Sequence, residues 1–296
     1  PPPPPSFQAE DGIRDTRIGL VGSEMCIRDS IVRSLLLSVF SLLLALSPAL
    51  AGSPDREREQ RLADQTVDAI LDGEPVFLTT PDNTRFLAIE MPAAGEPGRG
   101  AAIILHGRGT HPDWSQVAAP LRTALPEHGW STLSLQMPVL AKNAKYYDYL
   151  PVFPAAVPRI EAGIRHLRDQ GVERIVLIAH SCSVYMSMTW IEAMGDSGID
   201  AYIGIGMGAT DYGQPMSKPF PLRDIRVPLL ALYGGRDYPA VHRQAEHIST
   251  LLPELHPLSA VQMVTGANHY FNDADDDLVS AVVAWLDTLD AAAAPQ

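Results

Sequence analysis

Short runs of consecutive apolar residues alternate with longer stretches of helical periodicity along most of this chain. The apolar runs lie at residues 101–106, 131–136, 174–180, 201–206, 227–234 and 260–266. A strand covered by helices on both faces is apolar throughout, whereas a strand with one solvated face alternates between apolar and polar residues. The runs therefore predict a mostly parallel sheet that is buried between helices.

The stretches between and before these runs complete the predicted fold. Helical stretches fall at about 53–73, 113–126, 155–170, 183–194, 239–252 and 275–289. Two β-rich runs, 75–80 and 84–92, are joined by the turn sequence Pro81-Asp82-Asn83 and predict an antiparallel hairpin at the sheet edge. We therefore expect an α/β fold of about eight strands in one sheet, with right-handed crossovers and helices on both faces.

The first thirty residues resemble translated sequencing adapters. The stretch QAEDGIRD, residues 8–15, is what a common sequencing-library adapter encodes, and LVGSEMCIRD, residues 20–29, resembles a translated transposase adapter. We interpret residues 1–30 as an artefact of assembly that carries no function, with a proline-led disordered tail as the alternative.

Residues 31–51 have the order of parts that is typical of a signal peptide. Arg33 supplies the positive charge, an apolar core follows, and an Ala-Leu-Ala cleavage site ends at residue 51. The core is too short for a comfortable membrane span, although an uncleaved anchor is the alternative. We expect a single mature domain, residues 52–296, that is periplasmic or secreted and has no stable membrane span.

The charge balance limits the partners that this domain can bind. The formal net charge is −13 at pH 7 and stays strongly negative without residues 1–51. Such a surface repels nucleic acid and anionic lipid. Cys26 lies in the adapter-like segment, so Cys182 has no partner for an internal disulfide.

Chemically useful side chains follow four of the predicted strands. The four stretches are HGRGTHPDW (106–114), AHSCS (179–183), YGGRD (233–237) and GANHYFND (266–273). In open α/β sheets ligands bind beyond the carboxyl ends of the strands. These stretches therefore predict one site built from four separate parts of the chain.

With these four stretches, the chain resembles the α/β-hydrolases, and in particular a little-characterised group of exported bacterial members. The likeness covers residues 75–290, and serine, aspartate and histidine occur in the order that this fold uses for its catalytic triad. The resemblance implies that Ser181 is the nucleophile, His269 the general base and Asp237 the residue that orients it. It also assigns the oxyanion hole to the backbone amides of Arg108 and Cys182.

The turn around Ser181 departs from the pattern of the family. Glycine normally occupies both outer positions of G-x-S-x-G, whereas Ala179 and Ser183 occupy them here. Both replacements are small, so we expect a crowded turn that is still formed. Gly109 is a neighbouring candidate for an oxyanion donor.

Several alternatives for the site remain open at the level of sequence. Cys182 could replace Ser181 as the nucleophile, and Asp211, after the sixth apolar run, could replace Asp237 as the acid of the triad. His106 and His180 either take part in proton transfer or hydrogen-bond the turns that they precede.

The substrate pocket has four candidate residues. His111 either lines the mouth of the site or belongs to the start of a helix. Tyr146, Tyr147 and Tyr149 lie in a long aromatic connection and form either an apolar lid and acyl pocket or contacts that fix this loop to the domain.

No metal or cofactor is expected. The acidic stretch at 272–277 lacks the glycine and distal glutamate of a calcium loop and is explained by the start of a helix. No glycine-rich phosphate loop precedes a helix. The sequence therefore predicts an exported serine hydrolase that acts on a small-molecule acyl substrate, and the alternative is a non-catalytic binding or envelope-associated protein on a retained hydrolase scaffold.

Overall fold

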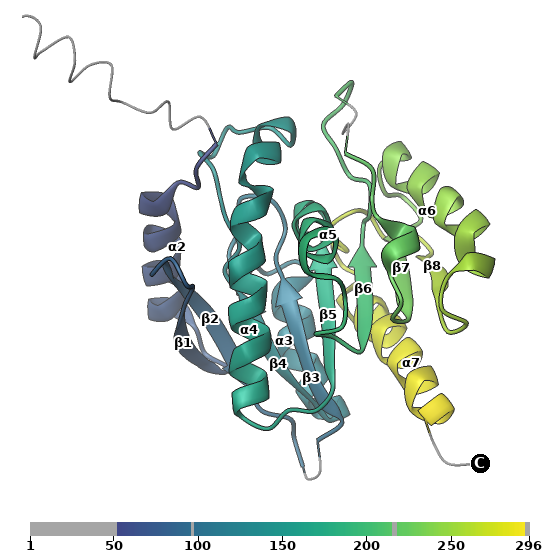
Figure 1. Ribbon diagram of the computed structural model, residues 1–296, viewed down its shortest axis with the longest axis horizontal. Coiled ribbons are helices and arrows are strands. Elements are labelled where there is room, and N and C mark those ends of the chain that lie inside the picture. The colour runs from purple at the N-terminus through teal and green to yellow at the C-terminus, as the bar shows by residue number, and fades with distance from the viewer. Residues whose placement is uncertain (1–51, 96–97, 215–217, 294–296) are drawn as a thin grey trace, which may run out of the picture. The chain divides into compact units, whose positions relative to one another are not determined.

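An eight-stranded sheet carries the fold in the computed structural model of the chain, which describes residues 52–95, 98–214 and 218–293 (Figure 1). The strands are β1 (Glu74–Thr79), β2 (Arg85–Met91), β3 (Gly100–Leu105), β4 (Trp130–Leu135), β5 (Ile175–His180), β6 (Ala201–Ile205), β7 (Leu229–Gly234) and β8 (Ala260–Val264). Their order in the sheet is β1-β2-β4-β3-β5-β6-β7-β8. Strand β2 runs antiparallel to β1 and to β4, and all other neighbours are parallel, which confirms the predicted edge hairpin and mostly parallel sheet.

Helices cover both faces of this sheet (Figure 1). The α-helices are α2 (Arg56–Ala69), α3 (Ala118–Ala124), α4 (Val157–Asp169), α5 (Cys182–Met194), α6 (Pro239–Leu251) and α7 (Asp275–Ala293). The 3₁₀ segments are η1 (Leu125–His128), η2 (Tyr147–Ala156), η3 (Leu222–Asp224) and η4 (Leu252–Glu254). Side chains from α4, α5 and α6 pack in one apolar cluster, and those from α3 and α7 pack in a second.

The central strands supply both clusters. In β3, Ile103 and Leu105 belong to the cluster beneath α4 and α5, whereas Ala102 and Ile104 belong to the cluster beneath α3 and α7. Successive side chains of a strand point to opposite faces, so a strand between two apolar layers must be apolar at every position. This requirement explains the unbroken apolar runs in the sequence.

The predicted helix at 113–126 is shorter than expected. It begins only at Ala118, because the chain forms a turn in which the amide of Trp114 donates to the carbonyl of His111, and Val117 has a positive φ of 65°. At its other end the helix passes into η1 at Leu125, next to Pro126. The predicted adapter segment 1–30 and signal peptide 31–51 lie outside the described residues.

Helix α2 joins the domain through a buried ion pair. Glu59 lies 2.6 Å from the guanidinium of Arg159 on α4, and both side chains are almost fully buried. The same glutamate accepts a hydrogen bond from the amide of Val139, and Arg159 donates to the carbonyl of Gln136. These contacts fix the start of the long connection between β4 and α4 against α2.

Arg58, on the same helix, bonds to two loops at once. Its guanidinium donates to the carbonyl of Gly109 at 2.7 Å and to that of Leu140 at 2.8 Å. Helix α2 therefore holds the turn after β3 and the connection after β4 in a fixed relation.

Within the described ranges, no helix combines the length and apolar character needed to cross a bilayer. Over the same residues, no three histidine, cysteine, aspartate or glutamate side chains converge as metal ligands would.

Candidate active site

Ser181 occupies the sharp turn between β5 and α5. Its φ of 59° and ψ of −113° are unfavourable for any residue with a side chain. The amide of Ser181 donates to the carbonyl of Ile205 at the end of β6, which holds the strained residue in place. The turn thus presents one serine hydroxyl at the carboxyl edge of the sheet, as the nucleophile elbow of a hydrolase does.

Three side chains from distant parts of the chain meet at this turn. The hydroxyl oxygen of Ser181 lies 2.7 Å from Nε2 of His269, and Nδ1 of His269 lies 2.7 Å from Oδ1 of Asp237. Asp237 follows β7, and His269 lies in the loop after β8. All three side chains are buried. The structure therefore brings together the three residues that the sequence predicted as a triad.

The hydrogen bonds define the direction of proton donation. The carboxylate of Asp237 can only accept, so Nδ1 of His269 carries the proton, and Nε2 accepts from the hydroxyl of Ser181. Oδ1 of Asp237 also accepts from the amide of Tyr238 at 2.7 Å. This arrangement is the one that general-base activation of a serine requires.

Asp211 occupies a different position. Its carboxylate forms an ion pair with Arg108 at 3.2 Å and accepts a hydrogen bond from the amide of Tyr146 at 2.6 Å. The partner of His269 is therefore Asp237, and the alternative in which Asp211 is the acid of the triad is wrong.

The absence of a side chain at Gly206 leaves room for the imidazole of His269. A Cβ atom at this position would lie 2.7 Å from Cε1 and 2.9 Å from Nδ1 of His269, and its φ of +64° also favours glycine. Sequence reasoning missed this residue, because its contact joins segments that are far apart along the chain. The only signal was its place as the last residue of the predicted strand at 201–206.

The two unusual positions of the elbow are both accommodated. Ala179 lies opposite Gly204 in the register of β5 and β6, so its methyl group faces a neighbour that has no side chain. The hydroxyl of Ser183 donates a hydrogen bond to the carbonyl of His106. The second replacement therefore links the elbow to the end of β3 and adds a polar contact to the tight turn.

Replacing Ser183 with alanine should lower the free energy of unfolding by about 1–3 kcal/mol, because the buried carbonyl of His106 loses its donor. Urea denaturation monitored by circular dichroism measures this change. Ser249→Ala is the matched control: its hydroxyl bonds only to a carbonyl of its own helix at the surface, so stability should stay within about 0.5 kcal/mol. Equal effects of the two variants would contradict the assignment.

The turn after β3 lies directly against the elbow. A Cβ atom on Gly107 would approach Nδ1 of His180 to 3.0 Å and Cβ of Ser181 to 3.8 Å. Within this turn the amide and hydroxyl of Thr110 both bond to the carbonyl of Gly107, and no described carbonyl accepts from the amide of Arg108.

Cys182 and Gly109 are the two other residues predicted to supply amide donors. Cys182 is the first residue of α5, so its amide has no acceptor inside the helix. Gly109 has its carbonyl fixed by Arg58. The predicted oxyanion residues thus lie on the two segments that adjoin Ser181.

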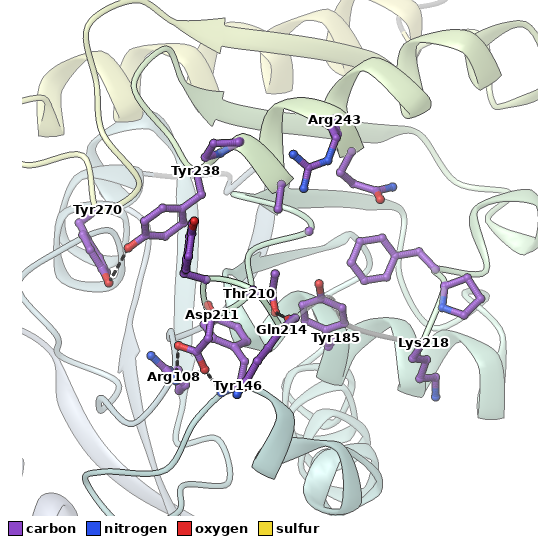
Figure 2. A pocket seen from close by; sticks show the side chains of 18 residues that line it. Arg108, Tyr146, Tyr185, Thr210, Asp211, Gln214, Lys218, Tyr238, Arg243 and Tyr270 are labelled. Carbon is purple, nitrogen blue, oxygen red and sulfur yellow. Dashed lines mark hydrogen bonds and ion pairs between the residues drawn. The ribbon is translucent and has the colours of Figure 1, made fainter.

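A pocket of about 700 Å³ is lined by tyrosines that contact residues of the triad (Figure 2). Tyr146 and Arg108 form part of its wall, and the hydroxyl of Tyr146 is hydrogen-bonded to that of Ser181. Tyr238 and Tyr270 also line the pocket. The centres of their rings lie 4.6 and 5.1 Å from the centre of the His269 ring, respectively. Tyrosine side chains therefore lie between this pocket and the side chains of Ser181 and His269.

Known structures share this arrangement of strands. An alpha-beta serine hydrolase homologue from Coxiella burnetii has a TM-score of 0.53 at 16% identity and covers 72% of this chain and 97% of its own. A dienelactone hydrolase from Anabaena variabilis has a TM-score of 0.56 at 14% identity, with coverages of 72% and 96%. An esterase from Pyrococcus furiosus has a TM-score of 0.54 at 17% identity, with coverages of 75% and 95%.

This chain has the α/β-hydrolase fold. The model of a family described as "Protein of unknown function (DUF3530)" matches residues 45–151. That match includes α2, the edge hairpin, the turn after β3 and most of the connection between β4 and α4. No curated protein matches the sequence.

The two histidines beside the turns of this α/β-hydrolase fold have structural contacts. Burial lowers the pKa of each to about 3, so both are neutral near pH 7. Nε2 of His106 accepts from the amide of Met137, and Nε2 of His180 donates to the carbonyl of His269. Both therefore position the turns of the site.

Cys182 is fully buried, and burial raises the pKa of its thiol well above the usual range. A thiol becomes a strong nucleophile only as the thiolate. Since Ser181 also holds the strained position and the contact with His269, the alternative in which Cys182 is the nucleophile is wrong.

Three of the four residues predicted to line the substrate pocket lie elsewhere. Tyr147 is half exposed, Tyr149 is buried with its hydroxyl accepting from the amide of Leu140, and the ring of His111 packs edge-on against Trp114. Because a 3₁₀ helix has three residues per turn, residues 146 and 149 face the domain, and residue 147 faces away. Of the four, only Tyr146 lines the pocket.

Proposed function

We propose that this protein is an exported serine hydrolase that cleaves carboxylic esters or related acyl bonds through an acyl-enzyme on Ser181. The observation that carries the proposal is the hydrogen-bonded series of Ser181, His269 and Asp237 at a strained turn. Such a series has little use in a purely structural role, since it places three polar side chains and a strained backbone in the interior.

The first chemical step uses the contacts already described. A lone pair of the Ser181 oxygen attacks the acyl carbon while the hydroxyl proton passes to Nε2 of His269, and the π electrons of the carbonyl move to its oxygen. Asp237 stabilises the imidazolium that forms. When the intermediate collapses, the leaving alkoxide takes the proton from His269, and water then repeats the sequence on the acyl-enzyme.

The developing oxyanion needs hydrogen-bond donors that are already in place. We assign this role to the backbone amides of Arg108 and Cys182, with Gly109 as the neighbouring donor. The first of these lies in the turn beside the elbow, and the second begins α5, where the helix dipole also favours negative charge.

Two further considerations support the proposal. The solved proteins of similar fold include an esterase and a dienelactone hydrolase, both named for hydrolytic activity. The predicted signal peptide at 31–51 supports a periplasmic or secreted location, where a small-molecule acyl substrate would be reached.

A fluorophosphonate probe tests the proposal directly. The purified, folded protein should be labelled, and peptide mapping should place the adduct on Ser181. The same preparation should hydrolyse p-nitrophenyl esters in a panel of graded acyl length. A folded protein that shows neither labelling nor hydrolysis would contradict the proposed hydrolase function.

One observation favours a second candidate, a non-catalytic binding or envelope-associated protein. The hydroxyl of Ser181 is buried and hydrogen-bonded to the phenol of Tyr146. A substrate therefore reaches the serine hydroxyl only after the side chain of Tyr146 moves. Ser181→Ala distinguishes the candidates, because a binding protein would keep its cellular role after this change.

A further inference from the structure

The nucleophile has a second hydrogen-bond partner that the triad does not require. The hydroxyl of Tyr146, which precedes η2, is hydrogen-bonded to the hydroxyl of Ser181. Both side chains are buried. Tyr146 is therefore the pocket residue in direct contact with the reacting oxygen.

The direction of this hydrogen bond follows from the rest of the site. Ser181 gives its proton to Nε2 of His269, so its oxygen can only accept from Tyr146. Burial raises the pKa of Tyr146 well above its usual value, which keeps the phenol protonated. In the resting site the tyrosine is thus a neutral donor aimed at the nucleophilic oxygen.

Arg108 and Asp211 hold this tyrosine in place (Figure 2). The guanidinium of Arg108 lies 4.4 Å from the centre of the Tyr146 ring, and the same group pairs with Asp211 at 3.2 Å. Asp211 in turn accepts from the amide of Tyr146 at 2.6 Å. A cation over the ring withdraws electron density, so it strengthens the hydroxyl as a donor.

We propose that the hydroxyl of Tyr146 is a catalytic hydrogen-bond donor to the acyl oxygen of the substrate, an inference that rests on the hydrolase function proposed above. When the oxygen of Ser181 bonds to the acyl carbon, the serine oxygen uses a lone pair in the new bond. Negative charge then appears on the acyl oxygen, which is two bonds from the serine oxygen. The donor that bonded to the serine then bonds to that oxygen. Tyr146 keeps its proton throughout, and the serine proton resides on His269.

The role of Tyr146 explains why Arg108 and Asp211 form an ion pair outside the triad. The backbone amide of Arg108 is a candidate oxyanion donor, and its side chain holds the ring of Tyr146. One residue would therefore position two donors around the same charge. Asp211, rejected as the acid of the triad, acts as a positioning residue for both.

Steady-state kinetics of Tyr146→Phe on a p-nitrophenyl ester test the proposal. We expect kcat to fall by about 10²-fold, as for the loss of one oxyanion donor, with KM changed by less than about threefold. A trifluoromethyl ketone, which forms a tetrahedral adduct with the serine, should bind more weakly by the same factor as kcat/KM falls.

Tyr233→Phe is the matched control. It removes a tyrosine hydroxyl from β7, outside the pocket and the triad, and should leave kcat and inhibition unchanged. If Tyr146 merely covers the nucleophile, Tyr146→Phe would leave kcat/KM equal or higher and would not weaken inhibition, and that result would overturn the proposal. Absence of hydrolysis by the unaltered protein would instead contradict the function itself.

A second variant keeps the test decisive should phenylalanine disturb folding. Replacing Tyr146 with 3,5-difluorotyrosine retains shape and hydroxyl but lowers the pKa of the phenol. A donor must be protonated, so kcat should gain a new decline at alkaline pH that the unaltered protein lacks. An unchanged pH profile, in a variant shown to contain the analogue, would contradict the role.

Discussion

We expect kcat to fall by about 10⁶-fold in Ser181→Ala and by the same factor in His269→Ala. The double variant should lose no more activity than either single variant. The reason is that the two side chains act as one unit: the base has no proton to accept without the hydroxyl, and the hydroxyl is a weak nucleophile without the base. Stopped-assay hydrolysis of a p-nitrophenyl ester over long incubation measures such residual rates.

The control for this series is His242→Ala. This histidine lies on α6 against Tyr233 and contacts neither the triad nor the pocket, so activity should be retained. If the losses of the two single variants instead added in the double variant, Ser181 and His269 would act independently, and the proposed mechanism would fail.

Acidification should destabilise the domain through its two buried histidines, His106 and His180. Burial lowers the pKa of each to about 3 in the folded protein, whereas the unfolded chain has the ordinary value of about 6.5. Between these values the unfolded state binds more protons, so the free energy of unfolding falls as the pH falls. Well above pH 6.5 neither histidine binds a proton in either state, so this contribution to the pH dependence vanishes.

The size of the effect follows from the slope of the unfolding free energy against pH. Each histidine contributes about 1.4 kcal/mol per pH unit within this window, so two contribute about twice that. Urea denaturation at intervals from pH 7.5 to pH 4 measures the slope. His180→Asn should reduce it by about half, whereas His247→Ala, at an exposed position of α6, should leave it unchanged. Equal slopes in all three proteins would contradict the burial argument.

The strands, and the meeting of polar side chains at their carboxyl ends, were predictable from sequence for a physical reason, whereas the order of the triad came from the resemblance to the α/β-hydrolases. A strand between two helical layers must be apolar at each position, and in a parallel sheet the carboxyl ends of the strands share one edge. Ser181, Asp237 and His269 each follow a predicted strand and were therefore expected to meet.

The parts that sequence did not predict depend on contacts between distant segments. Nothing near Gly206 indicates that the ring of His269 lies against it. The side chains of residues 146, 147 and 149 are chemically alike, and only the turn of the 3₁₀ helix decides which one faces the nucleophile. The hydroxyl of Ser183, expected only to crowd the elbow, donates to the carbonyl of His106, the residue directly after β3.

The contacts of α2 have a practical consequence for anyone who shortens or tags this protein. A chain that began at Gly73 would retain all eight strands and the whole triad, yet Gly109 and Leu140 would lose the arginine that bridges them, and Arg159 would be left as an unneutralised charge in the interior. Helix α2 therefore belongs to the scaffold that holds the candidate active site, and an affinity tag is better placed after α7 than directly before α2.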